Sequence, residues 1–558
     1  MKTVHYIDVI IIFTYIFAVI WYGLKKGKQS SSEEYFLAGR DATWPIVGIS
    51  LFAANISSST LVGLSGDAYS TGIAVFNYEW SAVVVLIFFS IFFLPFYLRS
   101  QVYTMPEFLE KRYDSRSRYY FAFVTLIGNI FIEMAAALYA CGVLIKLAFP
   151  DVPTWVIIAG LAFASAAYTI PGGLSSVIYT EVVQAILLIL SAVILSVITY
   201  IKIGGWSNAL AVTPPDMLSL VRPINDPSVP WLGLLFGVPI LGFYFWGTNQ
   251  FMVQRTLSSK DLNHGRWGAL FAGLLKLPVL FIMVFPGTMA RVLYNDEGGL
   301  LGKTLERADQ VYPSLIFDLM PTGLLGLMLA GLLAAMASSI SATLNSASTL
   351  VTMDFVKNIN PSLTSKQLVT VGKIATIVLV ILGACVAPLV EQFDSLFKYL
   401  QFVLAYICPP IVVAFLAGVF WKRATADGAF ASFIVGFICM ILLVVFNSDS
   451  TFSQWVLDYI PGAQHVVYYN TNADGVKEPV IHFLYIAPAL ALLSLIVLVS
   501  VSLFTSPPSQ EQVEAYIWRK SMYDAETKLL VGVPWYENFR YLSVILLIIT
   551  AILVISYW

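Results

Sequence analysis

Apolar stretches of about 20 residues recur along the whole chain and alternate with shorter polar segments. A helix of about 20 mostly apolar residues is long enough to cross the hydrocarbon core of a bilayer. The pattern therefore predicts an all-α integral membrane protein with about 14 transmembrane helices. The expected spans are residues 5–23, 44–68, 72–98, 119–149, 154–171, 177–201, 229–250, 267–291, 314–352, 368–390, 394–420, 426–446, 482–504 and 540–557.

Two of these stretches are interrupted by small polar residues. Residues 53–60 read AANISSST within the 44–68 span, and residues 338–341 read SSIS within the 314–352 span. Backbone that leaves the helix at bilayer depth is tolerated only where it is buried or lines a cavity, and such breaks hold substrate and coupling ion in secondary transporters. The two clusters therefore indicate a small-cation site shared between helices. The alternative is helix packing, because small polar residues also line ordinary interfaces between membrane helices.

The distribution of Lys and Arg predicts the orientation of the chain. If the N-terminus is outside, the cytoplasmic loops hold 20 of the 31 basic residues, whereas the exterior segments hold 7. We therefore expect a multi-pass protein of the cell (inner) membrane with its N-terminus and its C-terminus outside. The predicted cytoplasmic loops are residues 24–43, 99–118, 251–266, 353–367, 421–425 and 505–540.

Composition excludes several classes of protein. The chain is 58% hydrophobic and 11% charged, with a mean hydropathy of +0.81, which no soluble domain of 558 residues shows. The four cysteines all fall within predicted spans, and neither they nor the four histidines show metal-ligand spacing, so a membrane metalloenzyme fits poorly. No basic stripe indicates nucleic acid. The expected partners are the lipid bilayer and small solutes, with the chain as a monomer or a weak oligomer.

Charged residues within the spans are the next candidates for function, because intramembrane charge is costly. Glu79 and Lys276 are expected deep in their spans, and a carboxylate and an ammonium group can both hydrogen-bond sugar hydroxyls. Glu133 also falls within a span. A structural ion pair or snorkelling is the alternative in each case, and it is favoured for Lys146 and Lys398 because both lie near span ends.

An aromatic run occupies the middle of the 229–250 span, where residues 242–247 read GFYFWG. The flanking glycines permit a helix break, and Trp246 offers a flat apolar face. Sugars present one C–H face and a rim of hydroxyls, so an aromatic platform with a few polar groups suits them. Aromatic core packing is the alternative.

Several motifs, taken in order, resemble the sodium:solute symporter family, including its bacterial sodium/galactose-transporting members. They are EEYFLAGR (33–40), SLFAANIS (50–57), YEW (78–80), YTMPEFLEKRY (103–113), GGLSSVIYTEVVQ (172–184), NQFMVQRTL (249–257), LNSASTLVTMD (344–354) and WKR (421–423). Together these motifs span most of the chain, from Glu33 to Arg423.

The resemblance implies the LeuT-type fold, a 5+5 inverted repeat that works by alternating access. The broken first helices of the two repeats would be the AANISSST and GFYFWG spans. The implied units are an extra N-terminal helix with its cytoplasmic loop (1–43), the first inverted repeat (44–203), an exterior loop (204–228), the second inverted repeat (229–420) and three additional C-terminal helices (421–558).

The resemblance also implies a sodium site. Its residues would be Ala53, Ile56, Ala335, Ser338 and Ser339. The first three would donate backbone carbonyls and the serines their hydroxyls. Residues 335, 338 and 339 share one helix face because they are spaced i, i+3 and i+4, and five neutral oxygens suit a hard cation that must be released again.

The implied substrate site consists of Asn55, Glu79, Trp246, Lys276 and Gln401, with Phe245 at the inner gate. Thr60, Ala82 and Gly242 replace other polar contacts of the galactose-transporting members, and Phe245 replaces a tyrosine. A sugar is therefore implied but galactose is in doubt, and Glu133, on a helix that reaches the substrate in some members, disfavours an anionic substrate.

A second sodium site is conceivable at Glu181 and Ser341, as in some members of the family. Ala342 supplies no oxygen there and Glu181 is one methylene longer than the aspartate of similar proteins, which favours one sodium ion per sugar. The function implied is sodium-coupled import of a sugar, with Na⁺ as the coupling ion and no catalytic chemistry. The alternatives are a symporter for a polyol, an amino sugar or another small neutral solute, or a transporter-like sensor or channel.

Overall fold

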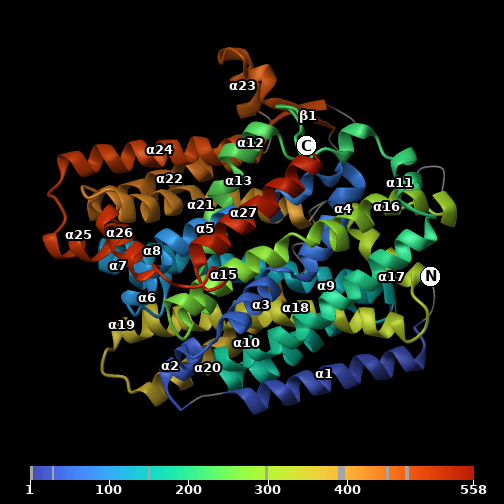
Figure 1. The fold of residues 1–558 in the computed structure, drawn as a ribbon, viewed down its shortest axis with the longest axis horizontal. Helices are drawn as coiled ribbons and strands as arrows, with labels where there is room; N and C mark the ends of the chain where they lie inside the picture. The colour runs from blue at the N-terminus through green and yellow to red at the C-terminus, as the bar shows by residue number, and fades with distance from the viewer. Residues whose placement is uncertain are drawn as a thin grey trace.

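The chain forms a bundle of long helices in the computed structural model (Figure 1). The structure describes residues 4–27, 30–148, 151–295, 299–386, 396–447, 451–471 and 477–558. The first part of the chain contains α1 (Tyr6–Lys26), α2 (Ser32–Leu37), η1 (Ala38–Arg40), α3 (Trp44–Asn55), α4 (Ser58–Thr71), η2 (Ile73–Phe76), α5 (Asn77–Phe92), α6 (Leu94–Arg99), α7 (Met105–Arg112), α8 (Ser115–Ile127), η3 (Gly128–Met134), α9 (Ala135–Ala148), α10 (Thr154–Lys202), α11 (Trp206–Val212) and η4 (Pro215–Leu218).

The middle of the chain is built from helices as well. It contains α12 (Trp231–Phe236), α13 (Val238–Phe243), η5 (Tyr244–Thr248), α14 (Gln250–Leu257), α15 (Leu262–Lys276), η6 (Leu280–Val284), α16 (Phe285–Leu293), η7 (Gly299–Leu301), η8 (Ala308–Gln310), α17 (Val311–Leu319), α18 (Leu324–Leu350), η9 (Val351–Val356), α19 (Lys357–Ile359), α20 (Ser365–Val386) and α21 (Leu396–Phe420).

The last part adds helices around one small sheet. It contains α22 (Ala426–Asn447), α23 (Thr451–Tyr459), η11 (Ala463–His465), β1 (Val467–Thr471), β2 (Lys477–Ile481), α24 (Phe483–Phe504), α25 (Gln510–Tyr516), α26 (Lys520–Leu529) and α27 (Phe539–Ser556). The strands β1 and β2 pair antiparallel, with Val467 opposite Ile481.

The described residues include 12 helices long and apolar enough to span a membrane, or up to 13 when the bent pair α3–α4 counts as one span. Among them, α10 has 49 residues and contains Pro171 and a non-helical Gly173 at φ 57°. At about 1.5 Å per residue its residues make about 74 Å of helix, more than twice the hydrocarbon thickness of about 30 Å, and the kink at Gly173 divides α10 into two helices. It therefore covers two of the predicted spans, 154–171 and 177–201, and this brings the structure into agreement with the prediction of about 14.

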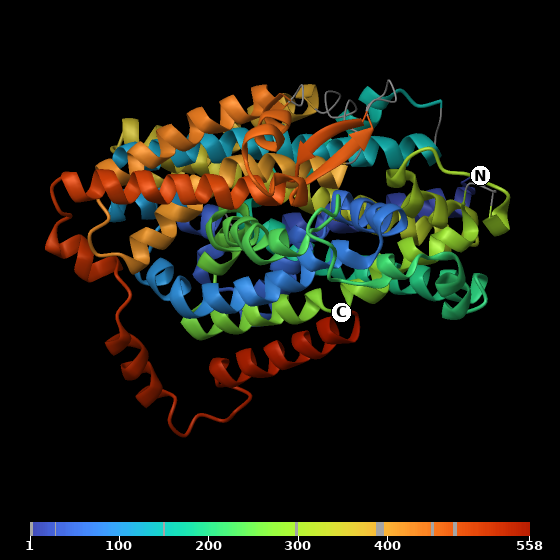
Figure 2. The ribbon, with the colours of Figure 1, turned by 90° about the horizontal axis from the view of Figure 1, so that it is seen from above.

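The centre of the bundle is α18, nearly all of whose residues are buried. It packs against α10, α1 and α3, and α3 in turn packs against α15. The helices α21, α22 and α24 form a second group, whereas α27 lies along the outside against α5 and α15, as Figure 2 shows. The helices α3, α4 and η3 pack against α18, and α5 packs against α13 and η5.

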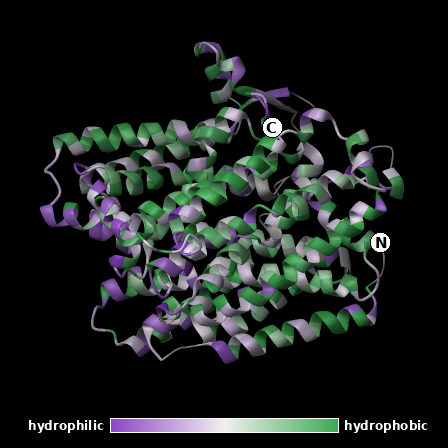
Figure 3. Ribbon diagram, in the orientation of Figure 1, coloured by the Kyte–Doolittle hydropathy of each residue, from purple (hydrophilic) through white to green (hydrophobic). Residues whose placement is uncertain are grey.

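The surface of the bundle matches a membrane environment. Large apolar side chains such as Phe17 on α1, Leu503 on α24 and Ile552 on α27 are exposed, which is typical of lipid-facing helices. Hydropathy along the ribbon is mostly high on the long helices (Figure 3).

The predicted cytoplasmic segments gather at one end. In Figure 1, α2, α7, α19, α25 and α26 lie toward the left, whereas the N-terminus and α11 lie toward the right. Cytoplasmic segments must all lie on the same side of the membrane, and this grouping meets that requirement. Which end faces the cytoplasm stays a prediction.

Candidate functional site

The polar sequence at 53–60 breaks the helix where it was predicted to do so. The helix α3 ends at Asn55, Ile56 has non-helical angles (φ −80°, ψ 79°), and α4 begins at Ser58 with Ser57 as its N-cap. The two halves are bent by 57°. Hydroxyl-bearing residues make the break stable, because they supply the hydrogen bonds that the backbone loses.

The hydrogen bonds at the break release two backbone carbonyls. In a continuous helix the N–H groups of residues 57 and 60 would donate to the carbonyls of Ala53 and Ile56. Instead, the Ser57 N–H donates to the Asn55 carbonyl at 2.9 Å, and the Thr60 N–H donates to Ser57 Oγ at 3.2 Å. The Thr60 hydroxyl also donates to the Asn55 carbonyl at 2.9 Å. The carbonyls of Ala53 and Ile56 are thus free of these partners.

Across from the break lies α18, which carries the predicted sodium-site residues Ala335, Ser338 and Ser339 on one face. The helix contacts both α3 and α4. The Ser338 hydroxyl is buried close to Glu181, without a hydrogen bond of ordinary geometry to any described residue. The Ser339 hydroxyl donates to the Ala335 carbonyl at 3.2 Å. A buried hydroxyl on a helix that contacts the break is the type of ligand that suits a small hard cation, and the sodium site itself stays a prediction.

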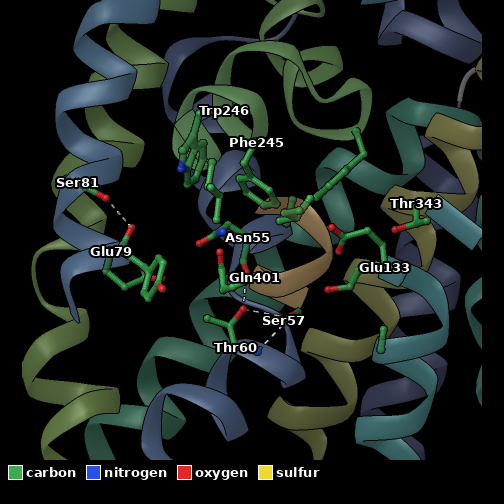
Figure 4. Close-up of a pocket in the computed structure, with 18 of the residues that line it drawn as sticks. Asn55, Ser57, Thr60, Glu79, Ser81, Glu133, Phe245, Trp246, Thr343 and Gln401 are labelled. Carbon is green, nitrogen blue, oxygen red and sulfur yellow. Dashed lines mark hydrogen bonds between the residues drawn. The ribbon is translucent and has the colours of Figure 1, made fainter. Parts of the chain in front are cut away.

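A cavity of about 90 Å³ opens beside the break (Figure 4). It is lined by residues of the break, of α5, of η3 and α9, of α13, η5 and α14, of α18 and of α21. The lining residues are Ala54, Asn55, Ser57, Thr60, Tyr78, Glu79, Ser81, Glu133, Ala137, Val238, Leu241, Gly242, Phe245, Trp246, Phe251, Ser339, Thr343, Gln401 and Leu404. Of the predicted substrate residues, all but Lys276 line it, and Ser339 of the predicted sodium site lines it as well.

Lys276 lies behind the cavity wall and neutralises one of its acids. Its Nζ donates to Glu79 Oε2 at 2.5 Å, and both side chains are buried. The ammonium group also lies 5.3 Å from the centre of the Trp246 ring. A buried carboxylate is tolerated when it is paired and hydrogen-bonded. The pair thus gives the buried Glu79 a hydrogen-bonded partner at the wall, and the carboxyl oxygens can accept further hydrogen bonds from a solute.

The aromatic run begins in α13 and continues in a π-helical turn. Residues 244–248 form the π-helical turn η5, in which the Asn249 N–H donates to the Tyr244 carbonyl at 2.8 Å. The break follows the run at Asn249 (ψ 126°), whose side chain caps α14. The flanking glycines therefore do not mark the break itself. Phe245 packs edge-on against Trp246 and Phe251, with ring centres 5.3 and 5.4 Å apart.

Comparison with known proteins identifies the family. Residues 35–436 match the family model described as "Sodium:solute symporter family". The chain is 35% identical to the Homo sapiens sodium/myo-inositol cotransporter 2 over 543 residues, which cover 91% of this chain and 78% of that protein. It is 32% identical to the Danio rerio sodium/glucose cotransporter 4 over 559 residues, which cover 94% of this chain and 82% of that protein.

The chain belongs to the sodium:solute symporter family. Its fold is similar to that of a Na⁺-coupled sialic acid symporter solved in a substrate-bound, outward-open state, with a TM-score of 0.74, 22% identity and coverage of 90% of this chain and 99% of that chain. The LeuT-type fold and the family resemblance predicted from the motifs are both confirmed. Sodium is the coupling ion of this family.

In this symporter the residues of the conceivable second sodium site already have protein partners. Glu181 forms a bidentate ion pair with Arg255 and also accepts a hydrogen bond from Ser50. The Ser341 hydroxyl contacts the Tyr168 hydroxyl at 2.5 Å and the Ala337 carbonyl at 2.6 Å. These contacts leave Glu181 less available as a ligand. The second site stays a prediction.

The structure also places residues that sequence reasoning did not assign. Ser81 and Thr343 line the cavity, as do the substituted positions Thr60 and Gly242, whereas Ala82 is buried elsewhere. Arg255, in a predicted cytoplasmic loop, is buried on α14. The buried Glu181 signalled that a cation must lie nearby, but nothing in the sequence identified which one. The side chain of Lys398 lies outside the described residues.

Proposed function

We propose that this symporter couples the entry of sodium to the import of a sugar or a cyclic polyol by alternating access. The observation that carries the proposal is the cavity beside the α3–α4 break. It combines the Trp246 ring, the Glu79 carboxyl group and the unpartnered amide oxygen of Asn55 next to two released carbonyls. Relatives named as myo-inositol and glucose cotransporters, similar over nine-tenths of the chain, support the same substrate class.

The solute side of the mechanism follows from the lining. One apolar face of the ring would lie against Trp246, and its hydroxyls would donate to Glu79 and to Asn55, whose Oδ1 is buried without a partner among the described residues. Gln401 can both donate and accept. Because the solute is neutral, it needs no compensating charge from the protein.

The sodium side would use the carbonyls of Ala53, Ile56 and Ala335 with the hydroxyls of Ser338 and Ser339. The α3–α4 break serves both ligands, because Asn55 lies between the two carbonyls. A bound sodium ion would fix the break and so orient Asn55 toward the solute. This shared element gives the two ligands a physical reason to bind cooperatively, and Phe245 would close the route toward the cytoplasm.

The two inverted repeats, at residues 44–203 and 229–420, would move relative to one another around this site, in the inner membrane and with both termini outside. One sodium ion crossing about −100 mV releases about 2.3 kcal/mol. A tenfold inward sodium gradient adds about 1.4 kcal/mol, and together they support accumulation of a neutral solute by about 500-fold.

The test is uptake into liposomes that contain the purified protein. Radiolabelled myo-inositol and glucose are offered with an inward sodium gradient or with potassium in its place. We expect uptake only with sodium, and accumulation that collapses when a sodium ionophore is added. Equal uptake in potassium would overturn sodium coupling, and a large sodium current in the absence of any solute would indicate a channel instead.

A further inference from the structure

Glu133 is the one acid of the cavity wall to which no role has been assigned. It lies in η3, a π-helical turn between α8 and α9. An extra residue in the turn rotates the side chains that follow it relative to a regular helix, and π-bulges recur at functional sites. Both Glu133 and Ala137, one turn later, line the cavity.

The Glu133 carboxylate has no partner in the described part of the chain. No hydrogen bond or ion pair of this side chain is found there, and no lysine, arginine or histidine lines the cavity. Asn129, one turn earlier, donates to Ser346 Oγ at 3.1 Å. Glu79 differs in this respect, because Lys276 neutralises it.

The two acids approach the cavity from opposite walls. Figure 4 shows Glu79 on one side and Glu133 on the other, next to Thr343, with Asn55 and Gln401 between them. An ionised carboxylate only accepts hydrogen bonds. A solute that fills the space must therefore present donors toward both walls, because an apolar or acceptor-only edge would strip water from Glu133 without replacing its hydrogen bonds.

We infer that Glu133 contacts the transported solute directly and selects ring solutes that carry hydroxyl or amino donors on two opposite edges. The inference rests on the proposed function and sharpens its substrate class. An inositol meets the requirement in every orientation, since each of its ring carbons carries a hydroxyl. A pyranose meets it only when its ring oxygen points away from Glu133, because that oxygen cannot donate.

The test combines substrate and protein changes in one thermodynamic cycle. Binding of myo-inositol, glucose and their single-deoxy analogues is measured by calorimetry in saturating sodium, with the purified wild type and with Glu133→Ala. We expect one deoxy position to weaken wild-type binding by about 10-fold or more and to have little effect in Glu133→Ala, because a hydrogen bond to a charged group is lost only in the wild type. The other deoxy positions should act equally in both proteins.

An amino analogue at the same position sharpens the result. Replacing that hydroxyl by an amine should strengthen binding to the wild type and lose this advantage in Glu133→Gln, which keeps the size of the side chain and removes its charge. Glu133→Gln also replaces the alanine variant should that variant fail to fold. The matched control is Asn129→Ala, one turn away on the same segment, which should affect all analogues alike.

Two results would overturn the inference. One is that every deoxy analogue loses the same affinity in Glu133→Ala as in the wild type. The other is a uniform rise in the sodium concentration needed for half-maximal binding, which would make Glu133 part of a cation site with Thr343 and Ser339. If the wild type bound none of these solutes in a sodium-dependent manner, the proposed function would fall, and this inference with it.

Discussion

The two helix breaks that frame the cavity are made in different ways. At the α3–α4 break, the hydroxyls of Ser57 and Thr60 and the backbone carbonyl of Asn55 form the replacement hydrogen bonds, and the carbonyls of Ala53 and Ile56 are released. At η5 the backbone keeps a π-helical bond to Tyr244 before it breaks at Asn249. The first break therefore exposes backbone oxygens, whereas the second presents large side chains.

This difference separates the roles of the two breaks. Backbone carbonyls suit a small cation, and aromatic faces suit the C–H face of a ring. Changes at the first break and on the facing α18 should thus alter sodium dependence first. Changes on the η5 side and at the Glu79–Lys276 pair should alter solute affinity first.

The largest effect is expected from Glu79→Ala. It removes a hydrogen-bond acceptor from the cavity wall. It also leaves Lys276 buried without its partner, which lowers the free energy of unfolding by about 3–5 kcal/mol for such pairs. Solute binding measured by calorimetry should weaken by about 100-fold or more. Gln401→Ala should act in the same direction. The double variant Glu79→Ala/Lys276→Met is the control for stability, and unchanged affinity in folded Glu79→Ala would move the solute site elsewhere.

The aromatic side of the comparison is tested by Trp246→Ala. Loss of the ring face should weaken solute binding by about 10-fold, while sodium-dependent protection against thermal unfolding in the absence of solute should be unchanged. Phe251→Ala, which removes a neighbouring ring that also lines the cavity, is the comparison variant. A change in sodium protection for Trp246→Ala would contradict the separation of roles.

The cation side is tested by Ser338→Ala and Ser339→Ala. Each removes one oxygen from a site with few, so the sodium concentration for half-maximal uptake should rise by about 10-fold. The matched control is Ser348→Ala on the same helix, because the Ser348 hydroxyl donates to the Gly372 carbonyl away from the site. Wild-type sodium dependence in both site variants would refute the assignment.

A smaller effect is expected from Ser57→Ala at the first break. The variant removes the N-cap acceptor of α4, which is worth about 1 kcal/mol, so sodium affinity should fall by about 5-fold through a less ordered break. Ser70→Ala at the far end of α4 removes a hydroxyl that donates to the Gly66 carbonyl and should leave sodium affinity unchanged. Equal effects of the two substitutions would show that the cap does not organise the site.

The sequence predicted the first break well and the second only in part. Asparagine and hydroxyl residues in an apolar span signal the first break directly, because they can replace backbone bonds. Aromatic residues carry no such signal, so the π-helical form of η5 and the shift of the break to Asn249 were not foreseeable. The direction of Glu133 depends on another π-helical turn, which helical periodicity does not reveal.

Contacts between segments that are distant in the sequence were the other feature that the sequence predicted poorly. The partner of Glu79 could be guessed, because Lys276 was one of few intramembrane cations. The partner of Glu181 could not, because Arg255 was assigned to a predicted cytoplasmic loop and not to a span. Such pairings depend on how the helices pack, which composition and spacing leave open.

The smallest expected effect concerns how many sodium ions accompany each solute. Both carboxylate oxygens of Glu181 accept hydrogen bonds from Arg255, so we expect Glu181 to position α14 rather than to ligate a second ion. In liposomes, a tenfold change in the solute gradient should then shift the reversal potential by about 59 mV, the value for one charge per neutral solute, and not by about 30 mV. Glu181→Gln should lower the stability of the protein and leave this shift unchanged. A wild-type shift near 30 mV that rises to about 59 mV in Glu181→Gln would show instead that a second sodium ion binds beside this carboxylate.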